Sequence, residues 1–289
     1  MEHRDNIMQW ESGRRSDNVE DDRGLSLPGG GIRIGGCSIL LILIISLLTG
    51  QNPLRLFAYL FEQQQTPQAS APQEPGRPQA NDQETDFVRV ILASTEDTWT
   101  EIFNGMHRNY VPPKLVLFSG EAQSGCGFAS AAVGPFYCSA DDKVYLDLTF
   151  FQELDQRFGA SGDFAQAYVI AHEVGHHVQN LLGITDRVQR LQEEGGDANA
   201  ISVRVELQAD CFAGVWGNHA DKERQMLEAG DVEEGINAAA AVGDDRIQQS
   251  AGRAVTPETW THGSSKMRVT WFKRGFESGD VSSCDTFQQ

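Results

Sequence analysis

Two histidines and a glutamate at helical spacing constrain this chain more than any other feature. Residues 171–177 read AHEVGHH, so His172 and His176 are four residues apart. In an α-helix this spacing puts both imidazoles on one face, one turn apart, where they can bind one cation. Glu173 follows the first histidine, where its carboxylate can act on water held by that cation. The H-E-x-x-H pattern predicts a zinc hydrolase site on a helix over residues 163–182.

A second acidic pair lies thirty residues after His176, on a separate predicted helix over residues 199–219. Glu206 and Asp210, within ELQAD, are again four residues apart. We expect Glu206 to complete a His₂Glu site for one Zn²⁺ per chain, with the fourth position left for water. Asp210 is expected to accept the outer N–H of a ligand histidine and so fix its tautomer. The alternative is a surface helix that carries two acids.

Two further histidines lie near these motifs. His262 lies in the loop THGS before an arginine-containing helical stretch, and two interpretations stay open for it. It either stabilises charge at the metal site as a second catalytic residue or is a plain loop histidine. Arg268 follows six residues later, where it either braces the loop or pairs with a carboxylate. His177 is turned about 100° from His176 around the helix, so we expect it to be packed or solvated rather than a ligand.

An uncharged apolar run, IGGCSILLILIISLLT, covers residues 34–49. Its sixteen residues fall short of the roughly 20 that cross a bilayer, but snorkelling of Arg33 brings it close to that length. The run predicts one transmembrane anchor over residues 34–50; a buried core helix and a cleaved signal peptide are the alternatives. The arginines near it are Arg14, Arg15, Arg23 and Arg33 before the run and Arg55 after it. This bias predicts a cytoplasmic N-terminus and a C-terminal domain outside the cytoplasm, in the periplasm if the cell is Gram-negative.

The anchor divides the chain into four stretches. Residues 1–33 are polar and predict a disordered cytoplasmic tail, and residues 51–85, rich in Gln and Pro, predict a linker. Residues 86–289, about 200 in all, are enough for one domain. Within that domain, hydrophobic spacing predicts helices over 87–103, 163–182, 185–194, 199–219 and 231–250 and strands over 114–118 and 143–148. The expected fold class is therefore α+β, mainly helical with a small sheet.

Charge and cysteines narrow the partners and the compartment. The formal charge is −18 and no basic patch is visible, so nucleic acid is not an expected partner. Four cysteines follow the predicted anchor, and in an oxidising compartment they allow three pairings. Cys126 and Cys138 bracket one loop, so a local bond between them is expected, which leaves Cys211 to pair with Cys284. Buried free thiols are the alternative.

With these motifs in place, the chain resembles the bacterial neutral zinc metallopeptidase family, the YpfJ-like proteins. The matching stretches cover nearly the whole chain: RRSDNVED, the apolar run, SGCG, GPFYC, VYLDL, HEVGHH, ELQADCFAGVW, HGSS and WFKRGFESGD. The H-E-x-x-H and ELQAD pair also resembles HtpX-type and CAAX-processing membrane peptidases, which carry a histidine in a loop after the E-x-x-x-D helix. The resemblance implies a gluzincin-like, zincin-type α+β domain with a short sheet over the active helix.

Together these features predict a membrane-anchored zinc peptidase that hydrolyses peptide or protein substrates with a metal-activated water. Glu173 is the expected general base, and an open strand edge over residues 143–148 is expected to pair with an extended peptide. Two other classes stay open: a non-catalytic, zinc-containing binding or adaptor protein of the cell envelope, and a zinc hydrolase that acts on a non-peptide substrate. The intact Glu173 argues against a purely structural zinc site.

Overall fold

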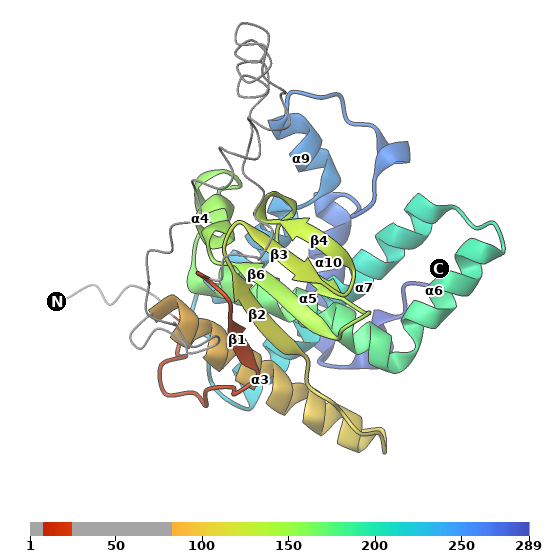
Figure 1. The fold of residues 1–289 in the computed structure, drawn as a ribbon. Coiled ribbons are helices and arrows are strands. Elements are labelled where there is room, and N and C mark those ends of the chain that lie inside the picture. The colour runs from red at the N-terminus through yellow and green to blue at the C-terminus, as the bar shows by residue number, and fades with distance from the viewer. Residues whose placement is uncertain (1–7, 25–82, 289) are drawn as a thin grey trace, which may run out of the picture. The chain divides into compact units, whose positions relative to one another are not determined.

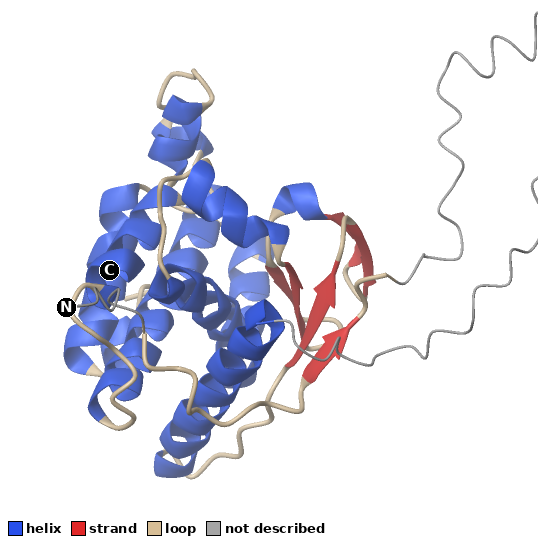
Figure 2. Ribbon diagram, turned by 90° about the vertical axis from the view of Figure 1, so that its left-hand side faces the viewer, coloured by secondary structure: helices blue, strands red, loops and turns tan. Residues whose placement is uncertain are grey.

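The computed structural model describes residues 8–24 and 83–288, and in this part of the chain a small sheet packs against a larger group of helices (Figures 1 and 2). The predicted α+β class, mainly helical with a small sheet, is confirmed. The sheet has the strand order β1-β2-β6-β5. Its strands are β1 (Val19–Asp21), β2 (Lys114–Phe118), β6 (Lys143–Asp147) and β5 (Phe136–Cys138). The first three run parallel, and β5 is antiparallel to β6.

The segment before the predicted anchor is part of this fold. β1 pairs with β2 in parallel, and Met8, Trp10 and Val19 are buried in the core. Glu96, itself buried, accepts hydrogen bonds from Ser16 Oγ at 2.5 Å and from Asn18 Nδ2 at 2.8 Å, and it pairs with Arg14. The expectation of a disordered tail is therefore wrong for residues 8–24, because their few apolar side chains are buried and their polar ones bind a buried carboxylate.

The helices largely follow the predicted ranges. They are α3 (Gln83–Gly105), α4 (Thr149–Gln156), α5 (Asp163–Leu182), α6 (Ile184–Glu193), α7 (Ala198–Lys222), α8 (Asp231–Ala241), α9 (Asp244–Ser250) and α10 (Ser265–Ser278). Short 3-10 helices cover Ala131–Val133, Pro257–Thr259 and Val281–Cys284. The single helix expected over 231–250 is two helices. They separate at Gly243, where the backbone is extended and a Cβ would lie 2.4 Å from the Ser265 nitrogen.

The stretch between β2 and β6, of which the part between Cys126 and Cys138 was expected to be a loop, contains a hairpin. Its strands β3 (Glu121–Ser124) and β4 (Gly127–Ser130) pair in antiparallel fashion. A disulfide between Cys126 and Cys138 joins the hairpin turn to the end of β5, and a second one between Cys211 and Cys284 ties α7 to the C-terminal segment. Both expected pairings are confirmed.

Small residues let the helices around α7 approach closely. A Cβ on Gly175 of α5 would lie 3.0 Å from the Ala209 carbonyl oxygen of α7. A Cβ on Gly275 of α10 would lie 1.9 Å from the Cys211 carbonyl oxygen, so no side chain fits between α10 and α7 there. This close packing brings Arg268 of α10 against the two helices that carry the metal-site motifs.

The predicted membrane anchor over residues 34–50 lies outside the described residues, as does the predicted linker up to residue 82. The last three residues assigned to that linker, 83–85, already belong to α3. Among the residues that the structure describes, no helix combines the length and the apolar character needed to cross a bilayer. The anchor therefore stays a prediction.

Candidate metal centre

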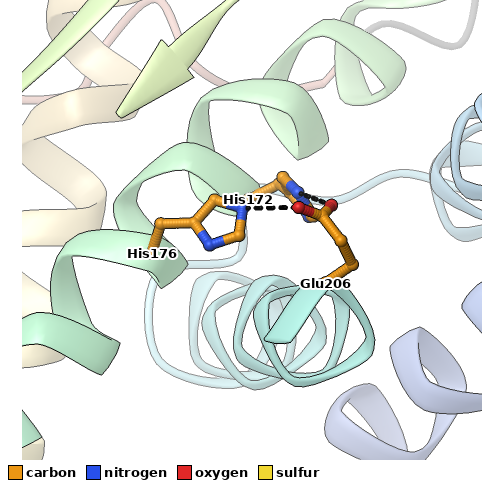
Figure 3. A group of neighbouring side chains, drawn as sticks. All are labelled: His172, His176 and Glu206. Atoms are coloured by element: carbon orange, nitrogen blue, oxygen red, sulfur yellow. Dashed lines mark ion pairs between the residues drawn. The ribbon is translucent and has the colours of Figure 1, made fainter. Parts of the chain in front are cut away.

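The two histidines of the H-E-x-x-H motif and the first acid of ELQAD meet between α5 and α7 (Figure 3). His172 Nε2 lies 3.2 Å from Glu206 Oε2, and His176 Nε2 lies 3.5 Å from Glu206 Oε1. The potential ligand atoms of the three residues are all within 4.8 Å of one another. All three side chains are largely shielded from solvent. The structure thus brings together the three residues that the motifs predicted as metal ligands.

The outer ring nitrogens of both histidines have partners of their own. His172 Nδ1 lies 3.0 Å from Asp210 Oδ1, and His176 Nδ1 lies 2.9 Å from Gln179 Oε1. When each Nδ1 carries the proton, each Nε2 presents its lone pair to the space beside Glu206. Two imidazole nitrogens and one carboxylate are a donor set typical of zinc, so the residues present fit this metal. Asp210 is placed where the sequence predicted it.

Electrostatics at this centre favour a cation. Burial disfavours the charged ring of His172, but hydrogen bonds to Asp210 and Glu206 outweigh it and raise its pKa to about 9. Burial works against the ionised form of Glu206, yet His176, His172 and Arg268 hold the pKa of that carboxyl well below its usual range. The pKa of Asp210 is lowered as well, so Glu206 and Asp210 both stay ionised at neutral pH. Zinc has to displace the proton of His172, because proton and metal compete for Nε2.

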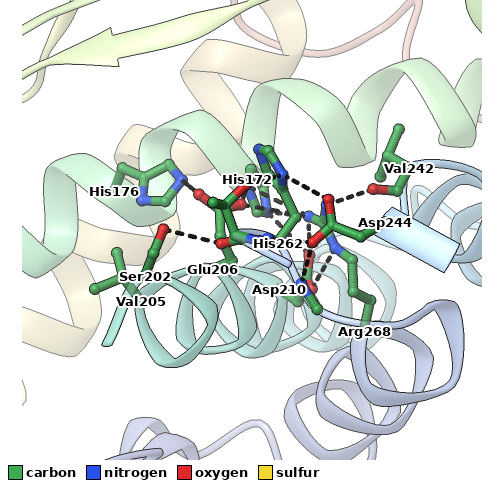
Figure 4. A network of polar contacts seen from close by, with 12 residues as sticks. His172, His176, Ser202, Val205, Glu206, Asp210, Val242, Asp244, His262 and Arg268 are labelled. Atoms are coloured by element: carbon green, nitrogen blue, oxygen red, sulfur yellow. Dashed lines mark hydrogen bonds and ion pairs between the residues drawn. The ribbon is translucent and has the colours of Figure 1, made fainter. Parts of the chain in front are cut away.

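Arg268 lies beside the metal centre and pairs with a carboxylate, which is one of the two alternatives left open for it (Figure 4). It is buried and binds Asp210 with two hydrogen bonds of 2.8 Å, from Nε to Oδ2 and from Nη2 to Oδ1. The Tyr168 hydroxyl donates a further hydrogen bond to Asp210. Arg268 also donates to the carbonyl oxygen of Val242, at 3.2 Å. Asp210, which orients His172, is thus itself held by a bidentate ion pair and a phenol.

His262 lies on the loop before α10 and lines the same cavity as the predicted ligands. Asp244 holds this loop, because its Oδ2 accepts hydrogen bonds from the backbone nitrogens of Thr261, His262 and Gly263 at 2.6–2.9 Å. The His262 Nδ1 lies 3.3 Å from Asp244 Oδ1, and no hydrogen-bond partner of its Nε2 is found in the described part of the chain. About half of the side chain is exposed. The ring is oriented, and Nε2 is left for a ligand in the cavity.

A cavity of about 680 Å³ opens at the centre. Glu173 lines it next to the three predicted ligands and is 8% exposed. Phe136 and Tyr137 of β5, and Pro135 just before it, also line the cavity. The expectation of an open edge over residues 143–148 is wrong for residues 143–145, because β6 lies between β2 and β5 and these residues pair on both sides. β5 is the edge strand on the cavity side.

Three further residues lie near the centre: His177, about which the sequence led to an expectation, and Gln179 and Asp244, about which it led to none. His177 is buried, and its Nε2 donates a hydrogen bond of 2.7 Å to the carbonyl oxygen of Val111, so it is a packed histidine, one of the two alternatives expected. Gln179 and Asp244 were missed. Gln179 lies three residues after His176 on the same helix, and that spacing is a signal for it. Asp244 has no local signal, because its partners are 17 to 19 residues away.

Comparison with known proteins shows which family the chain belongs to. Residues 8–287 match the model of the family described as "Putative neutral zinc metallopeptidase". YpfJ of Escherichia coli K12 is 48% identical over 291 residues, which covers 97% of this chain and 99% of that protein. Mb2605 of Mycobacterium bovis is 46% identical over 211 residues, which covers 70% of this chain and 71% of that protein. The names of both relatives carry the word "uncharacterized" and state no activity. No solved structure matches.

Proposed function

Because the chain belongs to the neutral zinc metallopeptidase family, we propose that it is a peptidase that hydrolyses peptide bonds with one zinc ion held by His172, His176 and Glu206. One observation carries this proposal: both Nε2 atoms face Glu206 while Asp210 and Gln179 hold the opposite ring nitrogens. The metal would supply Lewis-acid polarisation of the scissile carbonyl and a lowered pKa for water.

Glu173 acts as general base and then as general acid in this proposal. Its carboxylate takes a proton from water while the water oxygen forms a bond to the carbonyl carbon of the substrate. It then gives that proton to the amide nitrogen as the C–N bond breaks, so a carboxylic acid and an amine leave. Its place on the cavity wall, one residue after His172, supports this role.

His262 is proposed to stabilise the negative charge that develops on the carbonyl oxygen. The loop that carries it lines the cavity, and the Thr261 hydroxyl, 3.0 Å from Nδ1, can donate to that nitrogen, which leaves the proton of the neutral ring on Nε2. An N–H donor at Nε2 favours the transition state over the substrate, because the oxygen becomes more negative as the reaction proceeds. The free edge of β5 is the proposed site where an extended peptide adds as a further strand.

We also propose that the domain works outside the cytoplasm, anchored through residues 34–50. The two disulfides support this, because such bonds persist in oxidising compartments. The pairing of β1 with β2 adds a condition, since residues 8–24 and 83–288 fold together only on the same side of a membrane. A cytoplasmic N-terminus, as the arginine bias suggested, and an external domain are therefore incompatible with this fold if residues 34–50 cross once. We therefore place residues 8–24 outside with the domain, so that residues 34–50 hold the chain at the membrane without a single crossing.

The test combines metal analysis with peptide cleavage on the full chain in detergent. Wild type should contain one zinc per chain and cleave a mixture of quenched fluorescent peptides. Glu173→Gln should keep the zinc and lose about 10²–10⁴ in rate. Glu193→Gln, an exposed change at the end of α6, is the matched control and should keep full activity.

Two results would contradict the assignment. Equal activity in Glu173→Gln excludes that residue as the base, and a full zinc content in His176→Ala excludes it as a ligand. Zinc-replete wild type that cleaves no peptide in the mixture would instead favour one of the two alternatives, the adaptor protein or the hydrolase of a non-peptide substrate.

A further inference from the structure

A second group of carboxylates lies where α5 begins. Asp163 is the first residue of α5, and Asp231 and Glu234 belong to the first turn of α8. One carboxylate oxygen from each of the three lies within 4.8 Å of the other two. Asp163 precedes His172 by nine residues, so this acidic cluster lies ~13 Å from the zinc centre along the helix axis. The proposed peptidase reaction makes no use of it.

Helix capping explains only some of the oxygens in this cluster. Glu234 Oε2 accepts a hydrogen bond of 3.1 Å from the Phe164 nitrogen, and Asp231 Oδ2 accepts one of 2.8 Å from the Glu228 nitrogen. Gly162 leaves room for this cap, because a Cβ there would lie 2.0 Å from the Glu234 carboxylate. In these two contacts the acids hold the starts of α5 and α8.

Two buried oxygens remain after the caps are assigned. Asp231 is 0% exposed, and its Oδ1 has no hydrogen-bond partner among residues 8–24 and 83–288. Asp163 Oδ2 is likewise buried and without such a partner there. A buried carboxylate oxygen that accepts nothing costs free energy, because it has lost its water without a replacement. Both residues belong to the cluster, so a ligand between the carboxylates is the arrangement that would give both a partner.

The charge of the cluster is unbalanced in the described part of the chain. No lysine or arginine there forms an ion pair with Asp163, Asp231 or Glu234, and Glu228 adds a further negative charge nearby. Burial, followed by the repulsion from Asp163, raises the pKa of Glu234 to about 7. Burial likewise raises the pKa of Asp231 to about 6. At neutral pH and above, ionised carboxylates therefore face one another across a short gap.

We propose that Asp163, Asp231 and Glu234 bind a calcium ion. Their ligand atoms are all oxygens, which suits a hard divalent cation and separates this site from the nitrogen-containing zinc centre. Calcium accepts irregular oxygen geometry and bidentate carboxylates, whereas magnesium demands a near-ideal octahedron and retains its water. With only three protein carboxylates, the site matches the weak class of extracellular calcium sites, with Kd on the order of 10⁻⁴–10⁻³ M.

A bound ion would join α5 to α8, next to the N-terminal segment. Asp163 begins the helix that carries His172 and His176, and the other two acids belong to α8. The N-terminal segment reaches the same place, because Gln9 Nε2 donates to Glu228 Oε1 at 3.0 Å and the Gln9 nitrogen donates to the Met226 carbonyl oxygen at 2.7 Å. Calcium should therefore stabilise the folded domain without taking part in the zinc chemistry.

The test measures thermal unfolding and calcium binding of the zinc-loaded full chain. Calcium chloride is the only ligand added, and binding heat is recorded by titration calorimetry. At a hundredfold excess over Kd, the folded state gains a factor of about 100 in its equilibrium constant, which is ~2.7 kcal/mol. For a domain of this size the Tm should rise by about 5–10 °C.

Two variants on α8 decide whether the cluster is the site. Asp231→Asn removes one charge, but its amide oxygen can still accept the hydrogen bond from the Glu228 nitrogen. It should lose the calcium-dependent rise in Tm and the binding heat. Glu233→Gln, exposed on the same helix, is the matched control and should respond like wild type. Zinc content should be the same in all three proteins, so failure of this site is distinct from failure of the zinc centre.

The proposal is overturned if wild type shows no calcium-dependent shift or if the shift survives in Asp231→Asn. If calcium leaves the Tm of wild type unchanged and Asp231→Asn is more stable than wild type, the carboxylates share protons instead of binding a metal ion.

Discussion

Asp210→Asn tests the part of the zinc centre that is most deeply buried. Asp210 is 0% exposed and accepts hydrogen bonds from Arg268 and Tyr168 while it faces His172 Nδ1. The substitution keeps the shape of the side chain but removes its charge, so the Arg268 guanidinium stays buried without its bidentate partner. The nearest remaining carboxylate is Glu206, whose Oε2 is 3.8 Å from Arg268 Nη2.

The expected cost is large. Breaking a buried ion pair by removing one partner typically costs about 3–5 kcal/mol, because an uncompensated charge is left behind. For a domain of this size, that corresponds to a fall in Tm of about 6–20 °C. Zinc affinity should fall by about 10- to 100-fold, since the partner that orients His172 and sets its tautomer is weakened.

Two measurements check these numbers separately. Thermal unfolding of the metal-free protein reports the ion pair, and a zinc titration against a competing chelator reports the orientation of His172. The double variant Asp210→Asn with Arg268→Met removes both charges. It should recover much of the stability but not the zinc affinity.

The reasoning is refuted if Asp210→Asn changes the free energy of unfolding by less than about 1 kcal/mol, which is too little for a buried ion pair. Zinc affinity equal to that of wild type would separately refute the role of Asp210 in orienting His172.

Three further predictions follow from other parts of the structure. His262→Ala should lower kcat by about 10²–10³ at unchanged zinc content, as expected for one lost oxyanion donor; a normal kcat would return His262 to a plain loop residue. Cys284→Ser should cost about 2–5 kcal/mol of unfolding free energy by chemical denaturation, because it opens the bond that ties the C-terminal segment to α7 across 73 residues; no change would contradict this. The raised pKa of Glu234 means that the folded state holds a proton which the unfolded state loses near pH 4.3. The bound proton therefore stabilises the folded state fully below about pH 4.3, and this stabilisation is lost as the pH rises through about 7. Without calcium, wild type should lose stability relative to Glu234→Gln between about pH 4.5 and 7, and parallel stability curves would disprove the shift.

Local patterns in the sequence were sufficient to predict the two helices that carry the residues of the metal centre. His172 and His176, and likewise Glu206 and Asp210, are separated by four residues, and helical geometry alone puts each pair on one face. The apolar character of the strands over residues 114–118 and 143–148 was equally local, and both strands are present. The disulfide between Cys126 and Cys138 followed from their short separation.

Contacts between distant residues were decided only by the tertiary structure. β1 is short and polar, and it becomes a strand because β2, nearly a hundred residues later, offers it a parallel edge. The position of β6 inside the sheet follows from the strand order, which no alternation of side chains reveals. Arg268 had two possible partners until α10 packed against α7. The cluster of Asp163, Asp231 and Glu234 forms only when α8 packs against the start of α5. Helical spacing is set by the backbone of a single segment, whereas these contacts depend on how separate segments pack, and that information is spread over the whole chain.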